Sequence, residues 1–171
     1  MERYYEGDFS RHRDRILQMY YMAAENYDRA LNGLFTRDEA LLRDAIERDR
    51  QIDQMEVRID AECVELLLRL QPVARDLRLA VMSLKINTNL ERMGDQTVSI
   101  ARAGLDLARI PSVRDWFGLP DLAADARAAM ESALGAFTRE DSALARQVRA
   151  GDQGINRRYR ALLLSMIGAA M

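Results

Sequence analysis

The longest helical pattern in the sequence covers residues 37–109 and is interrupted by one proline, Pro72. On both sides of this proline, apolar residues recur at spacings of three and four, which is the period of an amphipathic helix. Arms of more than thirty residues, at 1.5 Å per residue, are roughly 50 Å long. A turn at Gln71-Pro72 therefore predicts a hairpin of two long antiparallel helices, with Pro72 at the first position of the second helix.

Another helix is expected before this hairpin, from Ser10 as N-cap to Gly33 as its end. Thr36 and Glu39 then fit a capping box, which predicts that the next helix begins there. The helix after Pro72 is apolar on more than one side and is expected to be the central helix. Together, these three segments predict a three-helix bundle.

The composition agrees with an all-α fold. The chain has 171 residues, of which 49% are hydrophobic and 30% charged, and it contains only 3 prolines. The net charge of −2, with basic residues scattered among acidic ones, gives no support for a nucleic-acid partner. Because no apolar leader or membrane-length run is present, we expect a cytoplasmic protein that meets membranes only through partners.

Counting along the hairpin brings two carboxylate pairs to one level. Residues that face each other across a turn at Gln71 have numbers that sum to about 142. The pairs at this level are Asp49 and Asp53 on the first arm, and Glu91 and Asp95 on the second. Within each pair the side chains lie on one face, where like charges repel. Such oxygen ligands suit hard or borderline cations, so these four residues are candidate metal ligands.

The interpretation of these acids as metal ligands has an alternative, and one further residue bears on it. The alternative is an ordinary charged face, in which Arg48, Arg50 and Arg92 neutralise the acids. Gly94, between the acids of the second arm, costs about 1 kcal/mol of helix propensity relative to alanine. Such a glycine usually marks the close approach of a neighbouring backbone or a ligand.

The second half of the sequence repeats part of the first. Phe137-Thr138-Arg139-Glu140-Asp141 matches Phe35-Thr36-Arg37-Asp38-Glu39 about 100 residues earlier. A second match places Asn156 where the first copy has Asp53. The repeated region supplies two helices and no counterpart of the helix that follows Pro72. The predicted organisation is a first three-helix repeat over 1–109, a connector over 110–120 and an incomplete two-helix repeat over 121–171.

Two stretches resemble the PhoU family of phosphate-signalling regulators: Asn89-Leu-Glu-Arg-Met-Gly-Asp-Gln-Thr-Val-Ser-Ile-Ala101 and, before it, Gln71-Pro-Val-Ala-Arg-Asp-Leu-Arg78. The resemblance implies a fold of two three-helix repeats, of which this chain has one and two thirds of another. It also implies that the carboxylates of E(D)-x-x-x-D motifs, here Asp49, Asp53, Glu91 and Asp95, bind a divalent or trivalent metal ion such as Fe, Mn, Zn or Mg.

The function implied by this resemblance is regulation rather than catalysis. PhoU proteins are expected to restrain the phosphate-starvation response by coupling the phosphate ABC transporter to its sensor histidine kinase. The expected partners are the transporter ATPase, the kinase and a second copy of the chain, since the incomplete repeat leaves an apolar face uncovered. A metal-storage or redox bundle and a metal-free adaptor of a phosphate transporter remain as alternatives.

The sequence contains few candidate catalytic residues. A ferritin-like di-iron centre requires Glu-x-x-His on two helices, but His12 is the single histidine. We expect it on the surface. Cys63, the single cysteine, has no companion for zinc binding and is expected to be a buried apolar side chain.

Overall fold

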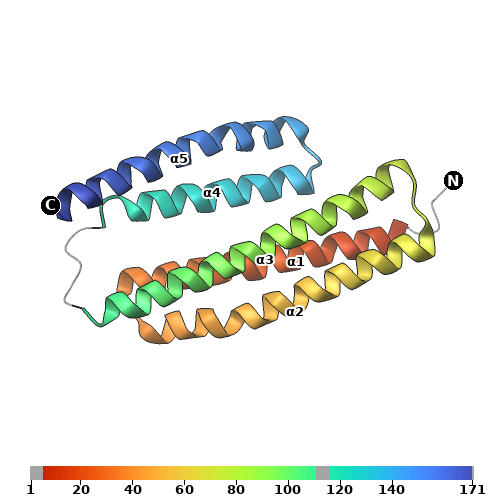
Figure 1. The fold of residues 1–171 in the computed structure, drawn as a ribbon. Helices are drawn as coiled ribbons and strands as arrows, with labels where there is room; N and C mark the ends of the chain where they lie inside the picture. The colour runs from red at the N-terminus through yellow and green to blue at the C-terminus, as the bar shows by residue number, and fades with distance from the viewer. Residues whose placement is uncertain (1–5, 111–115, 171) are drawn as a thin grey trace. The chain divides into compact units, whose positions relative to one another are not determined.

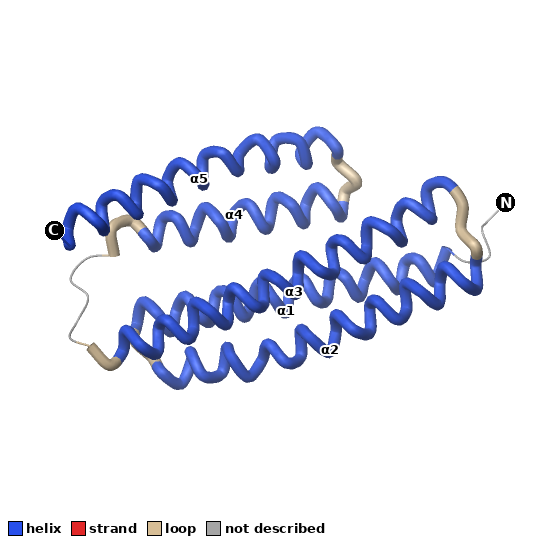
Figure 2. Tube along the Cα trace, in the orientation of Figure 1, coloured by secondary structure: helices blue, strands red, loops and turns tan. Residues whose placement is uncertain are grey.

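A computed structural model describes residues 6–110 and 116–170, and within these ranges every regular element is a helix (Figures 1 and 2). The helices are α1 (Glu6–Thr36), α2 (Glu39–Leu70), α3 (Ala74–Ala108), α4 (Leu119–Thr138) and α5 (Ser142–Ala170). The all-α prediction is confirmed. None of the described helices is both long enough and apolar enough to cross a membrane.

The chain divides after Ile110 into two compact units. The first contains α1, α2 and α3, and the second contains α4 and α5. Helix α4 begins at Leu119, two residues before the predicted start of the second repeat at 121. Part of the predicted connector, residues 111–115, lies outside the described residues.

In the first unit, each of the three helices packs along the other two (Figure 1). The expectation that α3 is the central helix is therefore wrong. Its buried face is largely small or polar, with Ala80, Ser83, Asn87, Gly94, Thr97, Val98, Ala101 and Gly104 among its members. Small side chains allow two neighbouring helices to approach closely, so α3 completes a triangular bundle rather than filling its centre.

Three contacts fix the register of the α2–α3 hairpin. The Cys63 thiol donates to the Ala80 carbonyl at 3.2 Å, and the Asn87 amide donates to the Glu56 carbonyl at 2.9 Å. Asp49 lies against Gly94. The numbers in each pair sum to within one residue of the expected value, so counting from the turn predicted the register correctly.

The α1–α2 turn differs from the predicted capping box. Thr36 remains in α1, where its hydroxyl donates to the Asn32 carbonyl at 2.7 Å. Asp38 is the N-cap of α2, and its carboxylate accepts from the amides of Ala40 and Leu41 at 2.9 and 3.2 Å. The shorter Asp38 side chain, placed directly before the helix, caps two amides at once and leaves Glu39 free of this role.

The positions of Gly33 and Pro72 also differ from prediction. Gly33 does not end α1, which continues to Thr36. A Cβ at residue 33 would lie 2.9 Å from Leu42 Cγ, so this glycine allows α2 to pack closely. Pro72 lies in the turn, two residues before α3, because Gln71 takes a left-handed conformation with φ of 42° and ends α2.

The second unit is a helical hairpin whose turn resembles that between α1 and α2. Asp141 accepts from the amides of Ala143 and Leu144, both at 2.9 Å, as Asp38 does at the start of α2. Thr138 donates to the Leu134 carbonyl at 3.0 Å, as Thr36 does to a carbonyl of α1. The repeated motif thus forms the same kind of turn twice.

Candidate functional site

Six carboxylates gather where α2 and α3 face each other, and we call them the acidic strip. Its members are Asp49, Asp53, Glu56, Asp60, Glu91 and Asp95. The four predicted metal ligands are among them and lie close enough for their charges to act on one another. Glu56 and Asp60 were not among the predicted ligands, although they continue the same spacing of three and four along α2.

Asp49 is the buried member of the strip. Its residue is 8% exposed, and its Oδ1 atom is buried without a hydrogen-bond partner. The pKa of this carboxyl is raised from 3.8 to about 6, mainly by burial and then by the charges of Asp53, Asp95 and Glu91, while Arg102 opposes the shift. The charged form of Asp49 is therefore poorly compensated by protein groups.

Gly94 provides the space that Asp49 occupies. A Cβ at residue 94 would collide with Asp49 Oδ1 and would lie 3.4 Å from Ile52 Cγ2. The sequence predicted a close approach at this glycine, and the approaching group is the Asp49 side chain. Residue 94 must lack a side chain for α2 and α3 to pack with this carboxylate between them.

The strip continues towards the α2–α3 turn. Partial burial raises the pKa of Glu91. The negative charge of Asp95 and the side-chain hydrogen bond between Glu91 and Asp95 also raise this pKa. Burial also raises the pKa of Glu56, followed by the charges of Asp60 and Asp53. Asp49, Glu56 and Glu91 are thus destabilised as anions by burial and by their neighbours, which is the electrostatic condition that a bound cation relieves.

Asn87 is a member of this region that sequence reasoning missed. It is fully buried on α3, and its amide donates to Asp60 Oδ1 at 2.8 Å as well as to the Glu56 backbone. Its own Oδ1 atom has no partner. An asparagine on the inner face of a long helix was the available signal, because a buried polar side chain requires partners across the interface.

The arginines proposed to neutralise these acids are engaged elsewhere or unpaired. Arg48 bonds to Asp44 at 2.8 Å and lies 3.7 Å from Glu25. In the part of the chain that the structure describes, Arg50, Arg92 and the acids of the strip form no salt bridge. The strip is thus not an ordinary face of ion pairs.

The metal prediction meets mixed evidence. Within residues 6–110 and 116–170, no three carboxylate, histidine or cysteine side chains are grouped so that they could hold one ion. The donor set itself suits a hard or borderline cation, and Asp49 offers a buried oxygen with no partner. Asp53 and Asp95 are exposed, and exposed side chains change rotamer within nanoseconds. Metal binding by these residues remains a prediction.

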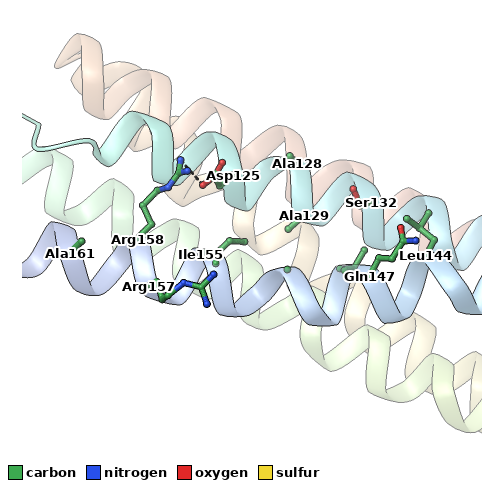
Figure 3. Close-up of a pocket in the computed structure, with 13 residues that line it drawn as sticks. Asp125, Ala128, Ala129, Ser132, Leu144, Gln147, Ile155, Arg157, Arg158 and Ala161 are labelled. Atoms are coloured by element: carbon green, nitrogen blue, oxygen red, sulfur yellow. Dashed lines mark ion pairs between the residues drawn. The ribbon is translucent and has the colours of Figure 1, made fainter.

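No second acidic strip is formed at the repeated motif. Asn156 donates to Asp152 Oδ2 at 2.8 Å, and both residues are exposed on α5. The hairpin of α4 and α5 instead encloses a groove of about 790 Å³ (Figure 3). The small residues Ala128, Ala129, Gly151 and Gly154 are part of its lining, and two other lining residues, Asp125 and Arg158, form an ion pair of 2.7 Å.

The predicted burial is correct for Cys63 and wrong for His12. Cys63 is fully buried, as predicted, and burial raises the pKa of its thiol. His12 is 2% exposed, so its expected surface position is wrong. His12 lies one helical turn before the buried Ile16, and residues four apart share one face of a helix, so His12 is on the inner face of α1.

Comparison with known proteins identifies the family. The PhoU domain matches residues 16–104, just over half of the chain. The chain belongs to the PhoU family. The crystal structure of PhoU from Pseudomonas aeruginosa matches with a TM-score of 0.92 and 32% identity, over 96% of this chain and 79% of that one. The PhoU structure from Streptococcus pneumoniae matches with a TM-score of 0.89 and 25% identity, over 96% and 77% of the two chains.

Sequence relatives carry the same family name. A phosphate-specific transport system accessory protein PhoU homolog of Pseudomonas aeruginosa is 34% identical over 91% of this chain. The PhoU of Escherichia coli is 27% identical, also over 91% of the chain. The chain spans 64% of the length of each of these relatives. The match to PhoU includes the α2–α3 hairpin, and with it the acidic strip.

Proposed function

We propose that this chain is a regulatory accessory component of a phosphate-specific transport system. The observation that carries the proposal is its similarity to PhoU of Pseudomonas aeruginosa, at 32% identity and a TM-score of 0.92. A relative from that organism is named as an accessory protein of such a system. In this role the chain acts by contact with partners and not as an enzyme.

The finer proposal is that the chain restrains the phosphate-starvation response. It would do so by coupling the ATPase of the phosphate ABC transporter to the sensor histidine kinase, from the cytoplasmic side of the membrane. This follows from the family resemblance. Support from the fold is that long helical faces offer extended docking surfaces for helices of other proteins.

The regulatory proposal is tested by deletion in the organism that encodes the chain. We expect a phosphate-starvation reporter to become active in phosphate-rich medium and to be silenced again by a plasmid copy. A reporter that stays silent in a strain without a second family member would refute the regulatory role. Co-purification of the transporter ATPase with the tagged chain tests the coupling separately.

A metal ion bound at the acidic strip is part of the same proposal. The supporting observations are the unpartnered Oδ1 atom of Asp49, the raised pKa of that carboxyl and the absence of salt bridges to the strip in the described ranges. Asp49, Asp53, Glu91 and Asp95 would hold Fe, Mn, Zn or Mg, and the ion would offset their mutual repulsion. Elemental analysis of protein purified without chelator tests this directly.

The same analysis separates the alternatives. Purified protein without stoichiometric metal favours a metal-free adaptor. An iron-loaded protein that consumes oxygen or peroxide favours a storage or redox bundle. Bound metal without such turnover agrees with a structural ion in a regulator.

We also propose that two copies associate through the α4–α5 unit. Large apolar side chains are exposed on the last turns of α5, among them Leu163, Leu164, Met166 and Ile167. An apolar patch of this kind is usually covered by a partner, and the two-helix unit has no third helix of its own in the described ranges.

Sedimentation velocity at micromolar concentration tests this association. We expect a dimer for the wild type and a monomer when Leu164→Glu and Ile167→Glu are combined. Val57→Glu, on an exposed position of α2, is the matched control and should remain dimeric. A stable wild-type monomer would refute the proposed dimer.

A further inference from the structure

A small polar cavity lies between the start of α1 and the end of α2, which run side by side (Figure 1). Its volume is about 260 Å³. The lining includes His12 and six charged side chains: Asp8, Arg11, Arg15, Glu62, Glu65 and Arg69. None of them belongs to the acidic strip, and the proposed regulatory role does not use them.

His12 is the unsatisfied group of this cavity. The residue is 2% exposed, and neither Nδ1 nor Nε2 has a hydrogen-bond partner. Buried polar atoms are almost always hydrogen-bonded, because leaving one unpaired costs its full desolvation. A neutral imidazole offers one N–H donor and one acceptor nitrogen, so a ligand with an oxygen at this position would satisfy the ring.

Two of the three carboxylates that line the cavity, Asp8 and Glu62, are paired with arginines. Asp8 accepts from Arg11 and, at 2.8 Å, from Arg69. Glu62 pairs with Arg15 at 2.7 Å. Each guanidinium carries five N–H donors, and these pairs use only part of them. Donors therefore remain for an additional acceptor, and an oxyanion matches the planar fork of arginine.

The electrostatic surroundings of His12 also favour an anion over a cation. Burial lowers the pKa of His12, and the charge of Arg15 lowers it further. In addition, the described residues contain no group of three metal-ligating side chains placed to hold an ion.

We propose that this cavity binds a small oxyanion of the size of phosphate or sulfate, held by His12 together with Arg15 and Arg69. The imidazole donates one hydrogen bond, and the two guanidinium groups provide charge-assisted ones. A phosphate that carries a proton can also donate to the second imidazole nitrogen, which sulfate at neutral pH cannot do. The proposal is independent of the regulatory role, because its test needs no partner protein.

The single histidine makes the test unambiguous. In the full chain labelled with ¹⁵N-histidine, every imidazole signal comes from His12. Inorganic phosphate is titrated at pH 7 and constant ionic strength, with sulfate and chloride in parallel. We expect saturable shifts of the ring nitrogen signals with phosphate, and a rise in the pKa of His12 when the anion is bound.

Two variants should change the affinity in opposite directions. Arg15→Gln removes a charge-assisted hydrogen bond and should weaken binding about tenfold or more. Glu62→Gln frees Arg15 from its partner and should tighten binding several-fold, roughly in line with the loss of one competing ion pair. Arg43→Gln, which loses an exposed ion pair with Glu39 elsewhere on α2, is the matched control and should bind as the wild type does.

Each outcome decides the proposal. Saturable shifts with phosphate and sulfate support a general oxyanion site, and shifts with phosphate alone support a site that also uses the phosphate proton. Signals unchanged by all three anions would overturn the proposal. It would also be overturned by equal responses to chloride, by wild-type affinity in Arg15→Gln, or by weaker binding in Glu62→Gln.

Discussion

Replacement of Asp49 by asparagine should stabilise the metal-free protein at neutral pH. Burial and three acidic neighbours raise the pKa of this carboxyl from 3.8 to about 6. At about 1.4 kcal/mol per pKa unit, ionised Asp49 lowers the free energy of unfolding by about 3 kcal/mol at pH 7 and above. The asparagine amide brings donors that need partners, so we expect a net gain of about 1–2 kcal/mol.

The pH dependence of this effect has a definite sign. Because the pKa is raised in the folded state, the protonated carboxyl stabilises the protein below about pH 4, and this contribution is lost as the pH rises through about 6. Asparagine does not titrate. The advantage of Asp49→Asn should therefore be absent near pH 4 and reach its full size above about pH 7.

Urea unfolding with chelator present, at pH values from 4 to 8, measures this difference. Asp44→Asn is the matched control on the same helix, because Asp44 accepts from Arg29 and Arg48 at 2.9 and 2.8 Å. That variant should lose up to about 1 kcal/mol at neutral pH. If Asp49→Asn gives no stabilisation at pH 8, or a gain that does not depend on pH, the electrostatic account of the acidic strip is wrong.

Two further predictions concern the same bundle. The double variant Glu91→Gln and Asp95→Asn should bind metal more weakly than the wild type, because two candidate ligands lose their charge. Its metal-free form should be no less stable than the wild type, because the repulsion between the carboxylates is relieved. Unchanged binding in calorimetric titrations with Fe, Mn, Zn and Mg would contradict this prediction. His12 has a lowered pKa, so its contribution to stability should be present above about pH 6.5 and fall below it. Urea midpoints of the wild type and His12→Gln should then converge on acidification, and a constant difference would argue against a buried neutral imidazole.

Much of the helical framework follows from local sequence. The spacing of apolar residues at three and four, the scarcity of proline and the turn at Gln71-Pro72 fix the hairpin, and the constant rise per residue fixes its register. Contacts such as Cys63 with Ala80 lie within one residue of the position obtained by counting. Helix ends were predicted less well, because Thr36, Asp38 and Glu39 all have side chains suited to a cap and only the turn geometry selects Asp38.

For the candidate site, too, some features follow from the sequence and others only from tertiary packing. The sequence by itself determined that two acidic pairs meet at one level of a hairpin, because this depends only on spacing along two helices of known rise. Tertiary packing decided which acid is buried: Asp49 enters the interface because Gly94 leaves room for its carboxylate, and Asp53 and Asp95 stay exposed. Packing also placed His12 inside the bundle. His12 lies one turn before Ile16 on α1, and its burial depends on the helices that pack over this face.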